Sequence, residues 1–333
     1  MRKLASIQKI LKLEPIPGAD NIEKAKVLGW QLVVKKGEFK EGDLCVYCEI
    51  DSILPDRPEF EFLGPNRRIK TAKIRKQISQ GICFGLSILP DLEKNIVINN
   101  DISDSGLIGQ DCTDILGIIK YESEQEETSS KNSFPEFVHK TDETRVQNLQ
   151  GELTANKDKV CYITEKLDGS SITFYLHNGE FGVCSRNINL DKDPTNNFWK
   201  AAIEIDIETK LRDFGRNIAI QGELVGEGIQ KNPLKLKGKS VFVFSIFNID
   251  TQRYVDHAEF MNITESLKLT TVPIIQTDYI LSDDINEIIT MATRKSVLNN
   301  QIWAEGLVIR PLIQTEDFRS FKAINPEFLL KFE

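Results

Sequence analysis

The sequence predicts an α+β protein of two domains, a small N-terminal β-barrel followed by a larger domain in which strands and helices alternate. Residues 1–120 consist of short apolar runs separated by glycine and proline, with little helical periodicity, which is typical of a small barrel. A polar, glutamate-rich segment follows, and beyond it strand and helix patterns alternate. We therefore expect domains at residues 1–120 and 141–333, separated by an exposed linker at 121–140.

Composition places the chain among globular intracellular proteins. Its 333 residues, 37.9 kDa and 40% apolar content are enough for two domains with their own cores. No apolar run approaches the roughly 20 residues of a membrane helix, and the N-terminus lacks the pattern of a signal peptide. We therefore expect a cytoplasmic protein without membrane partners.

Six cysteines are scattered through apolar segments, which favours reduced, buried thiols over a disulfide framework. They are Cys45, Cys48, Cys83, Cys112, Cys161 and Cys184. Cys45 and Cys48 form a C-x-x-C pair, but no second pair stands at zinc spacing. Because Leu44–Cys48 is a good strand pattern, we expect the pair to be structural.

The clearest strands of the N-terminal domain are Trp30–Val34 and Leu44–Ile50. The net charge of −8 argues weakly against a nucleic-acid partner, but the charge is unevenly distributed. A basic stretch without acidic residues contains Arg67, Arg68, Lys70, Lys73, Arg75 and Lys76. Such a stretch could neutralise RNA phosphates, or it could be the charged face of an edge strand that prevents edge pairing.

The stretch 160–175 is the centre of the second domain. Two apolar runs, Val160–Ile163 and Ile172–Tyr175, indicate strands on either side of an Asp-Gly turn. Lys166 at the strand end could reach into a pocket and attack phosphorus, and Gly169 would let backbone approach a nucleotide closely. The alternative is a surface hairpin in which Asp-Gly only makes the turn.

Helical periodicity predicts one helix over residues 195–214, capped by Gly215, and another over 282–298 with an acidic first turn. Strands are expected at 218–225, 241–247 and 302–310. In the second of these strands Phe242 and Phe244 share one face, and one of them could stack on a purine.

A polar segment precedes the central stretch. Residues 141–148 are expected to form a short helix or turn, capped by Thr141 or Asp142, which carries Arg145 towards the second domain.

Three carboxylates stand on separate predicted strands. Strand alternation puts Glu223 opposite the apolar face of its strand, and Glu305 interrupts an apolar strand. With Asp168 they could hold a hydrated Mg²⁺ or Mn²⁺ near nucleotide phosphates, although each alone is more often an exposed strand residue. Arg186 and Lys322 are the best placed cations to complete a phosphate clamp.

The order of these residues resembles the motif series of covalent nucleotidyltransferases, the ATP-dependent ligases and mRNA capping enzymes. The series is Lys166-x-Asp168-Gly169, Ser185-Arg186-Asn187, Gly222-Glu223, Phe244-Ser245-Ile246, Glu305-Gly306-Leu307-Val308 and Ser320-Phe321-Lys322. The chain looks most like RNA ligases of the Deinococcus and Naegleria type, which carry an OB domain ahead of the nucleotidyltransferase domain. The leading barrel and the segment Thr141–Asn148 support this resemblance.

The resemblance implies an OB-type barrel and a nucleotidyltransferase domain of antiparallel sheets with flanking helices. It implies ATP-dependent joining of 3′-OH to 5′-phosphate ends of RNA, at nicks in a duplex, with AMP carried on Lys166. Glu223 would bind the ribose, Phe244 would stack on adenine, and Lys322 would contact the α-phosphate.

The same resemblance assigns the remaining site residues. Metal-bound waters would be held by Asp168, Glu223 and Glu305. ATP-binding residues would be Glu165, Lys166, Arg186, Glu223, Phe244, Glu305 and Lys322, and those with catalytic roles would be Lys166, Asp168, Glu223, Glu305 and Lys322. Arg145 would bind the RNA 5′ end or the nucleotide. Our own hypothesis, from the basic stretch, is that the barrel binds RNA through Lys70, Lys73, Arg75 and Lys76. We expect a monomer.

One departure and two alternatives accompany this prediction. Many ligases have Lys-x-Lys in the last motif, whereas here Ser320 and Ile324 stand two positions from Lys322, so the role of a second lysine is unassigned. An mRNA capping guanylyltransferase or a DNA ligase usually continues into a further domain, but only 11 residues follow Lys322. A non-catalytic RNA-binding protein would explain the basic stretch but not the ordered lysine and carboxylates.

Overall fold

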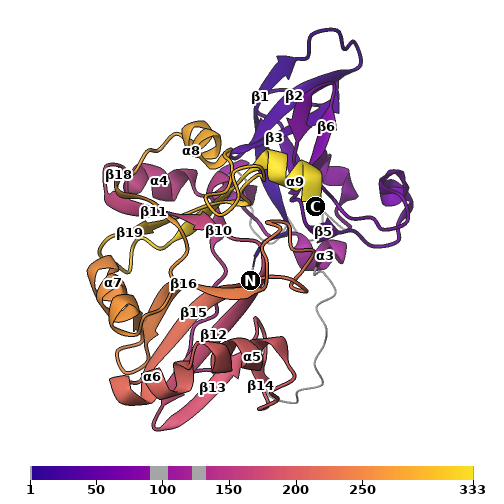
Figure 1. The fold of residues 1–333 in the computed structure, drawn as a ribbon. Coiled ribbons are helices and arrows are strands. Elements are labelled where there is room, and N and C mark those ends of the chain that lie inside the picture. The colour runs from indigo at the N-terminus through magenta and orange to yellow at the C-terminus, as the bar shows by residue number, and fades with distance from the viewer. Residues whose placement is uncertain (1, 91–103, 122–132, 333) are drawn as a thin grey trace. The chain divides into compact units, whose positions relative to one another are not determined.

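The computed structural model describes residues 2–90, 104–121 and 133–332. The chain divides into two compact units, one formed by residues up to 125 with Leu329–Lys331, and the other by residues 126–328 with Phe332. No helix among the described residues is long and apolar enough to cross a membrane. Figure 1 shows the secondary structure of both units.

The first unit contains a curled five-stranded sheet in the order β3-β2-β1-β4-β8. Its strands are β1 (Ala5–Pro15), β2 (Ile22–Val27), β3 (Trp30–Lys35), β4 (Leu44–Cys48) and β8 (Ile82–Phe84). The first half of β1 pairs with β4 and the second half with β2, with a register shift after Ile10. One strand therefore belongs to two ladders, which curls the sheet around a core that includes Trp30, Tyr47 and Phe60.

Short elements complete the first unit. They are β5 (Ser52–Ile53), β6 (Ala72–Ile74), β7 (Gln77–Ser79), β9 (Ile119–Lys120), η1 (Pro58–Leu63), η2 (Leu86–Ile88), α2 (Asp104–Leu107) and α3 (Thr113–Leu116). The predicted strands in residues 30–34 and 44–50 correspond to β3 and β4. The four cysteines of this unit are buried and free, as are the two of the second unit.

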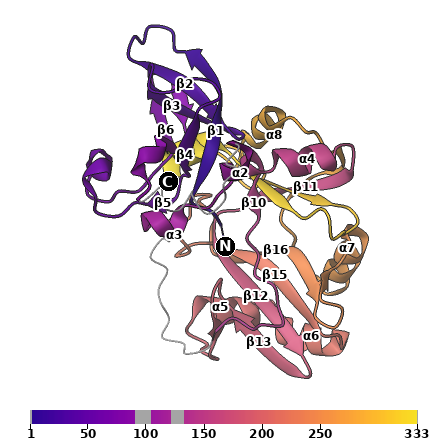
Figure 2. The ribbon, with the colours of Figure 1, turned by 180° about the vertical axis from the view of Figure 1, so that it is seen from behind.

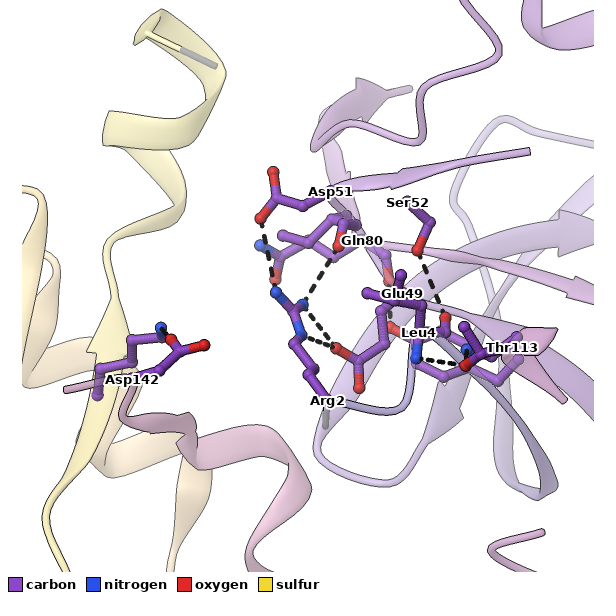
Figure 3. A network of polar contacts seen from close by, with 12 residues as sticks. Arg2, Leu4, Glu49, Asp51, Ser52, Gln80, Thr113 and Asp142 are labelled. Atoms are coloured by element: carbon purple, nitrogen blue, oxygen red, sulfur yellow. Dashed lines mark hydrogen bonds and ion pairs between the residues drawn. The ribbon is translucent and has the colours of Figure 1, made fainter. Parts of the chain in front are cut away.

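Polar contacts fix the beginning of the chain to the sheet (Figure 3). The Arg2 guanidinium donates to the Glu49 carboxylate at 2.9 and 2.6 Å and to the carbonyl of Ile50 at 3.2 Å. The backbone N–H of Leu4 donates to Thr113 Oγ1 at 2.9 Å. Because Glu49 is buried, its pairing with Arg2 satisfies a charge that would otherwise destabilise the fold.

The second unit has two sheets. The five-stranded sheet has the order β10-β20-β19-β11-β18, and the six-stranded sheet has the order β14-β13-β12-β15-β16-β17. The strands of the first are β10 (Thr144–Arg145), β11 (Val160–Lys166), β18 (Ile274–Ile280), β19 (Gly306–Pro311) and β20 (Phe321–Ile324). Those of the second are β12 (Ser170–His177), β13 (Glu180–Cys184), β14 (Asn189–Leu190), β15 (Ile218–Gly226), β16 (Lys239–Asn248) and β17 (Arg253–Tyr254). All pairs are antiparallel except β10 with β20.

Helices cover one face of each sheet. They are η3 (Val146–Asn148), α4 (Gln150–Ala155), α5 (Asn197–Glu204), α6 (Ile207–Phe214), α7 (His257–Ser266) and α8 (Ile285–Ala292). A further helix, α9 (Pro326–Phe332), follows β20 in the chain. Apolar residues of α5, α6 and α7 share a core with β12 and β15. On the five-stranded sheet, α4 and α8 lie side by side (Figure 2) and pack against β11, β19 and β20. The predicted α+β architecture is therefore confirmed.

Two predicted helices are shorter than expected. The helix over 195–214 is wrong as one element, because Asp206 adopts a left-handed φ of +50° and separates α5 from α6. The helix over 282–298 ends at Ala292, since Ser296 and Val297 instead form hydrogen bonds to the carboxylate of Glu165. Gly215 ends α6 in a left-handed conformation, as predicted.

Two other elements also differ from the prediction. The strand expected over 302–310 begins at Gly306, because the N–H groups of Ile302 and Ala304 donate within the preceding loop, so Glu305 precedes the strand rather than interrupting it. Residues 144–145 form a strand and only 146–148 a helical turn, and no side chain caps that turn. Asp142 is engaged in an ion pair instead.

The linker expected at 121–140 is described only in part. Residues 122–132 lie outside the described residues. Phe134 and Val138 are buried with Tyr175, Ala219 and Phe247, on the face of the six-stranded sheet opposite α5 and α6. The end of this segment therefore packs on the second unit.

Candidate active site

The chain crosses from one sheet to the other between Lys166 and Ser170. Lys166 ends β11 opposite Gly306 of β19, and Ser170 begins β12 opposite Leu224 of β15. The two predicted strands exist, but they pair in different sheets, so the alternative of a surface hairpin is wrong. The crossing brings the lysine to strand ends of both sheets.

Gly169 allows this crossing to pass directly against β15. A Cβ at this position would lie 2.4 Å from the carbonyl oxygen of Leu224 and 3.0 Å from Cγ of Glu223. Only glycine leaves room for so close an approach of two backbones. The glycine therefore keeps Asp168, its neighbour in the chain, close to Glu223.

Lys166 is paired with Glu305. Both carboxylate oxygens of Glu305 lie 2.7 Å from Lys166 Nζ, and the two side chains are 24% and 15% exposed. Burial lowers the pKa of Lys166, but the charges of Glu305, Glu223 and Asp168 outweigh burial and raise it above its usual value. The nucleophile candidate is therefore held as an ammonium group.

The other two carboxyls have raised pKa values. Burial raises the pKa of Asp168, and the charge of Glu305 acts in the same direction. The charge of Lys166 opposes them, and the net result is a pKa of about 7. Burial also raises the pKa of Glu223. The charge of Lys166 opposes this rise, those of Glu305 and Asp168 add to it, and the net result is a pKa of about 8. Three carboxyl groups thus share one ammonium group, an excess of negative charge that a cation would relieve.

This donor set fits a hydrated magnesium or manganese ion. Both ions prefer carboxylate oxygen, and Mg²⁺ usually keeps several of its waters. Across residues 2–90, 104–121 and 133–332, no three His, Cys, Asp or Glu side chains converge closely enough to bind a metal directly. If Asp168, Glu223 and Glu305 bind such an ion, they would hold it through its waters rather than as a closed cage.

A group of cations lies beside the carboxylates. Lys322 Nζ donates to Asp142 Oδ1 at 3.1 Å, and the same oxygen lies 3.6 Å from Arg186 Nη2. Arg145 stands next to Lys322 in the parallel β10–β20 pair. Burial lowers the pKa of Lys322, and Arg145 and Lys166 act in the same direction. The charge of Asp142 opposes them, and the net result is a pKa of about 8. Three cations expected from separate parts of the sequence thus come together.

Glu165 is engaged in the protein core. The residue is 1% exposed, and its carboxylate accepts hydrogen bonds from Ser296 Oγ at 2.5 Å and from the Val297 N–H at 2.7 Å. Burial raises its pKa, against the effect of these two hydrogen bonds. Glu165 therefore anchors the loop 293–305, which ends at Glu305.

Phe242 and Phe244 lie on the same face of β16, as the alternation predicts. Both are half-buried against a cluster that includes Leu167 and Val225, and the guanidinium of Arg310 lies 5.7 Å from the ring of Phe244. Phe244 thus lies near the crossing that carries Lys166.

Arg310 and Glu143 form an ion pair that the sequence analysis did not predict. Arg310 Nη2 lies 3.2 Å from Glu143 Oε1, and Arg310 Nη1 donates to Thr164 Oγ1 at 2.9 Å. Arg310 is buried in a strand that is otherwise apolar, and a buried arginine requires a partner, which is the signal that could have found it.

The predicted RNA-binding lysines and arginine of the first unit are exposed on or beside a short hairpin. Lys73 lies in β6, Arg75 and Lys76 form the turn to β7 with φ of +47° and +67°, and Lys70 precedes β6. The other two cations of the basic stretch, Arg67 and Arg68, pair with acids of the same unit. The hairpin is a separate two-stranded sheet rather than an edge of the five-stranded one.

Comparisons with known proteins agree with this division. A family model for an OB-fold domain matches residues 4–86, and an RNA ligase family model matches residues 158–324. No curated protein matches the chain.

Solved structures of the Naegleria gruberi RNA ligase are similar to the chain over nearly its whole length. An aspartate-to-alanine variant in the apo form is 37% identical, with a TM-score of 0.88, over 99% of this chain and 98% of that one. A glutamate-to-alanine variant with AMP and Mn is 38% identical, with a TM-score of 0.89, over 99% of both chains. A lysine-to-alanine variant with ATP and Mn is 38% identical, with a TM-score of 0.87, over 99% and 98%.

Proposed function

The chain belongs to the RNA ligase family, and we propose that it joins RNA 3′-OH and 5′-phosphate ends with ATP through a covalent adduct of AMP on Lys166. The observation that carries this proposal is the pairing of a strand-end lysine with Glu305, beside two further carboxylates and a group of cations. The similar Naegleria enzyme has been solved with ATP and with AMP, each with Mn, which supports the choice of nucleotide.

In the first step, Lys166 Nζ attacks the α-phosphorus of ATP. A P–N bond forms, the bond to the β-phosphate oxygen breaks, and pyrophosphate leaves. An oxygen of an RNA 5′-phosphate then attacks the phosphorus of this AMP, the P–N bond breaks, and Lys166 leaves as the amine. The neighbouring 3′-OH finally attacks the 5′-phosphorus and loses its proton, and AMP leaves as the phosphodiester bond forms. Such transfers depend on positioning and charge neutralisation.

Lys166 must lose a proton before it attacks. The three carboxylates around it stabilise the ammonium form, so the proton leaves only when their charge is neutralised. A bound Mg²⁺ or Mn²⁺, held through water by Asp168, Glu223 and Glu305, would supply that neutralisation and would stabilise charge on the phosphates.

The remaining residues bind and orient the nucleotide. Lys322 contacts the α-phosphate, Arg186 and Arg145 serve the nucleotide or the RNA 5′ end, and Phe244 stacks on adenine. Glu223 also binds the ribose. Glu165 contributes to the ATP site through the loop that it anchors.

We further propose that residues 1–120 form the RNA-binding OB domain, and that the protein is a monomer that seals nicks in duplex RNA. The exposed cations of the β6–β7 hairpin support the first part, because basic contacts bind phosphates. Six free, buried thiols support a reducing, cytoplasmic location.

The test is incubation with α-labelled ATP or, separately, GTP and a divalent ion, followed by a denaturing gel and mass analysis of the labelled lysine. We expect an ATP-specific adduct on Lys166 that is absent in Lys166→Ala, and joining of nicked RNA duplexes by the wild type. A GTP adduct would indicate capping chemistry. The absence of any adduct, in protein free of prior adenylation, would leave an RNA-binding protein and refute the proposal.

A further inference from the structure

The carboxylate of Asp142 contacts two of the cations that lie beside Lys166, Lys322 and Arg186. Asp142 Oδ1 accepts a hydrogen bond from Lys322 at 3.1 Å and lies 3.6 Å from Arg186. Lys322 belongs to the five-stranded sheet, whereas Arg186 follows β13 of the six-stranded sheet. Lysine and arginine groups that converge on one oxyanion are the usual way in which proteins bind a phosphate. The position of the Asp142 carboxylate is therefore one that a phosphate oxygen could take.

The segment around Asp142 is fixed on both sides. Its neighbour Glu143 forms the ion pair with Arg310, and Arg145 is in register with Lys322 in the β10–β20 pair. The backbone of Asp142 is thus held in place by contacts that do not depend on its own side chain.

The Asp142 side chain itself is exchangeable. It is 46% exposed, whereas the Lys322 side chain is 16% exposed. An ion pair with such access to water is weak, because solvent screens it and can replace either partner. A nucleotide polyphosphate carries several charges and can displace a single carboxylate from the two cations.

We propose that the Asp142 side chain competes with phosphate for Lys322 and Arg186 and so determines specificity. It pairs with these two cations until a polyphosphate displaces it. This inference rests on the proposed function, since that function assigns the two cations to phosphate. Asp142 neutralises the two cations and so weakens the binding of small anions.

The experiment compares Asp142→Asn, which keeps the size of the side chain and removes its charge, with the unchanged residue. Both are measured in the full chain with Lys166→Ala, which prevents covalent turnover. The probes are pyrophosphate alone and ATP, and the dissociation constants are measured by calorimetry. We expect Asp142→Asn to bind each probe about twofold to fivefold more tightly, the range for the loss of a partly exposed ion pair.

Two further variants make the result specific. Glu316→Gln removes the same charge from an ion pair with Arg253 elsewhere in this unit and should leave both dissociation constants unchanged. Asp142→Glu keeps the charge. Its affinity for pyrophosphate should be at most twofold higher than that of the Lys166→Ala protein in which Asp142 is unchanged. This variant distinguishes lost competition from a general loosening of the segment.

Unchanged or weaker binding of pyrophosphate by Asp142→Asn would overturn the inference. Weaker binding would mean that Asp142 orients the cations for phosphate rather than competing with it. The pyrophosphate measurement needs no adenylation, so its outcome stands apart from the proposed function. If the wild type formed no adduct with ATP, the proposed function would fail even where Asp142→Asn bound pyrophosphate more tightly.

Discussion

Lys166 Nζ lies 2.7 Å from each carboxylate oxygen of Glu305, so the candidate nucleophile is neutralised by the residue that would also bind the metal ion. Glu305 contributes the largest of the charge effects that raise the pKa of Lys166. A lysine in this state cannot attack phosphorus, because its lone pair is protonated. Activation of the nucleophile is therefore linked to whatever neutralises Glu305, Glu223 and Asp168.

Glu305→Gln should lower the pKa of Lys166 in the metal-free protein. The amide keeps the shape of the side chain but removes the charge that opposes loss of the proton. The pKa can be measured by labelling with an amine-specific reagent over a pH series and quantifying the modified Lys166 by mass spectrometry. In the wild type, half-maximal labelling should lie above pH 10.5, and in the variant it should move to lower pH. Coincident labelling curves would contradict the assigned role of Glu305.

Binding of Mg²⁺ or Mn²⁺ should become tighter as pH rises from 6 to 8. The pKa values of Asp168 and Glu223 are raised to about 7 and about 8, so these groups carry protons at pH 6 that a cation must displace. Each displaced proton changes affinity by up to about tenfold per pH unit, and the dependence should level off above both values. Calorimetry with Mn²⁺ in two buffers of different ionisation enthalpy measures the affinity and the protons released. Affinity independent of pH, without proton release, would contradict this account.

The sequence was sufficient to predict the α+β architecture and the family, because the local strand patterns are strong and the motifs stand in the order typical of these ligases. It could not predict that β11 and β12 belong to different sheets, since an Asp-Gly turn between two apolar runs also fits a hairpin. It predicted a helix over 282–298 that in fact ends at Ala292, because apolar spacing does not reveal that Glu165 binds Ser296. Tertiary hydrogen bonds outweighed helix periodicity there.

The sequence also could not predict the ion pairs that Asp142 forms. The sequence predicts Thr141 or Asp142 as a cap, which is the usual role of these residue types at the start of a helix. Its actual partners, Lys322 and Arg186, are distant in sequence. Long-range ion pairs of this kind leave no periodic signal in the chain.

Gly169→Ala should destabilise the protein and abolish adenylation. The added Cβ would lie 2.4 Å from a backbone oxygen of β15, which cannot move without disturbing the sheet. Overpacking of this kind costs about 1–3 kcal/mol of unfolding free energy. Denaturant unfolding and the adduct assay measure the two effects. Gly151→Ala in α4 is the control, because a Cβ there meets nothing within 4 Å, and it should be as active as the wild type.

Glu143→Gln should weaken both the fold and the binding of ATP. The variant leaves the buried guanidinium of Arg310 without its charged partner, which costs about 1.5–3 kcal/mol. Because Glu143 also fixes the segment that carries Asp142 and Arg145, the KM for ATP in adenylation should rise more than kcat falls. Glu316→Gln breaks an exposed ion pair and should change neither the unfolding midpoint nor KM. An unfolding midpoint equal to that of the wild type would show that the Glu143–Arg310 pair is not structural.

Charge reversal on the β6–β7 hairpin should reduce RNA affinity and its dependence on salt. The substitutions are Lys70→Glu, Lys73→Glu, Arg75→Glu and Lys76→Glu, all at exposed positions. Each lost phosphate contact reduces the slope of log K against log salt by about 0.7–0.9. Binding of a nicked RNA duplex is measured between 50 and 200 mM salt. Over this range the affinity of a protein with six phosphate contacts falls on the order of a thousandfold.

The control for the hairpin is charge reversal at Lys36 and Lys40, which are exposed near the loop between β3 and β4. Because adenylation of Lys166 does not require RNA, the hairpin variant should still form the AMP adduct at the wild-type rate. If its affinity for nicked RNA and its salt slope equalled those of the wild type, the hairpin would not be the RNA contact. If adenylation fell instead, the basic residues of this unit would serve the ATP phosphates, because only the nucleotide step would have been affected.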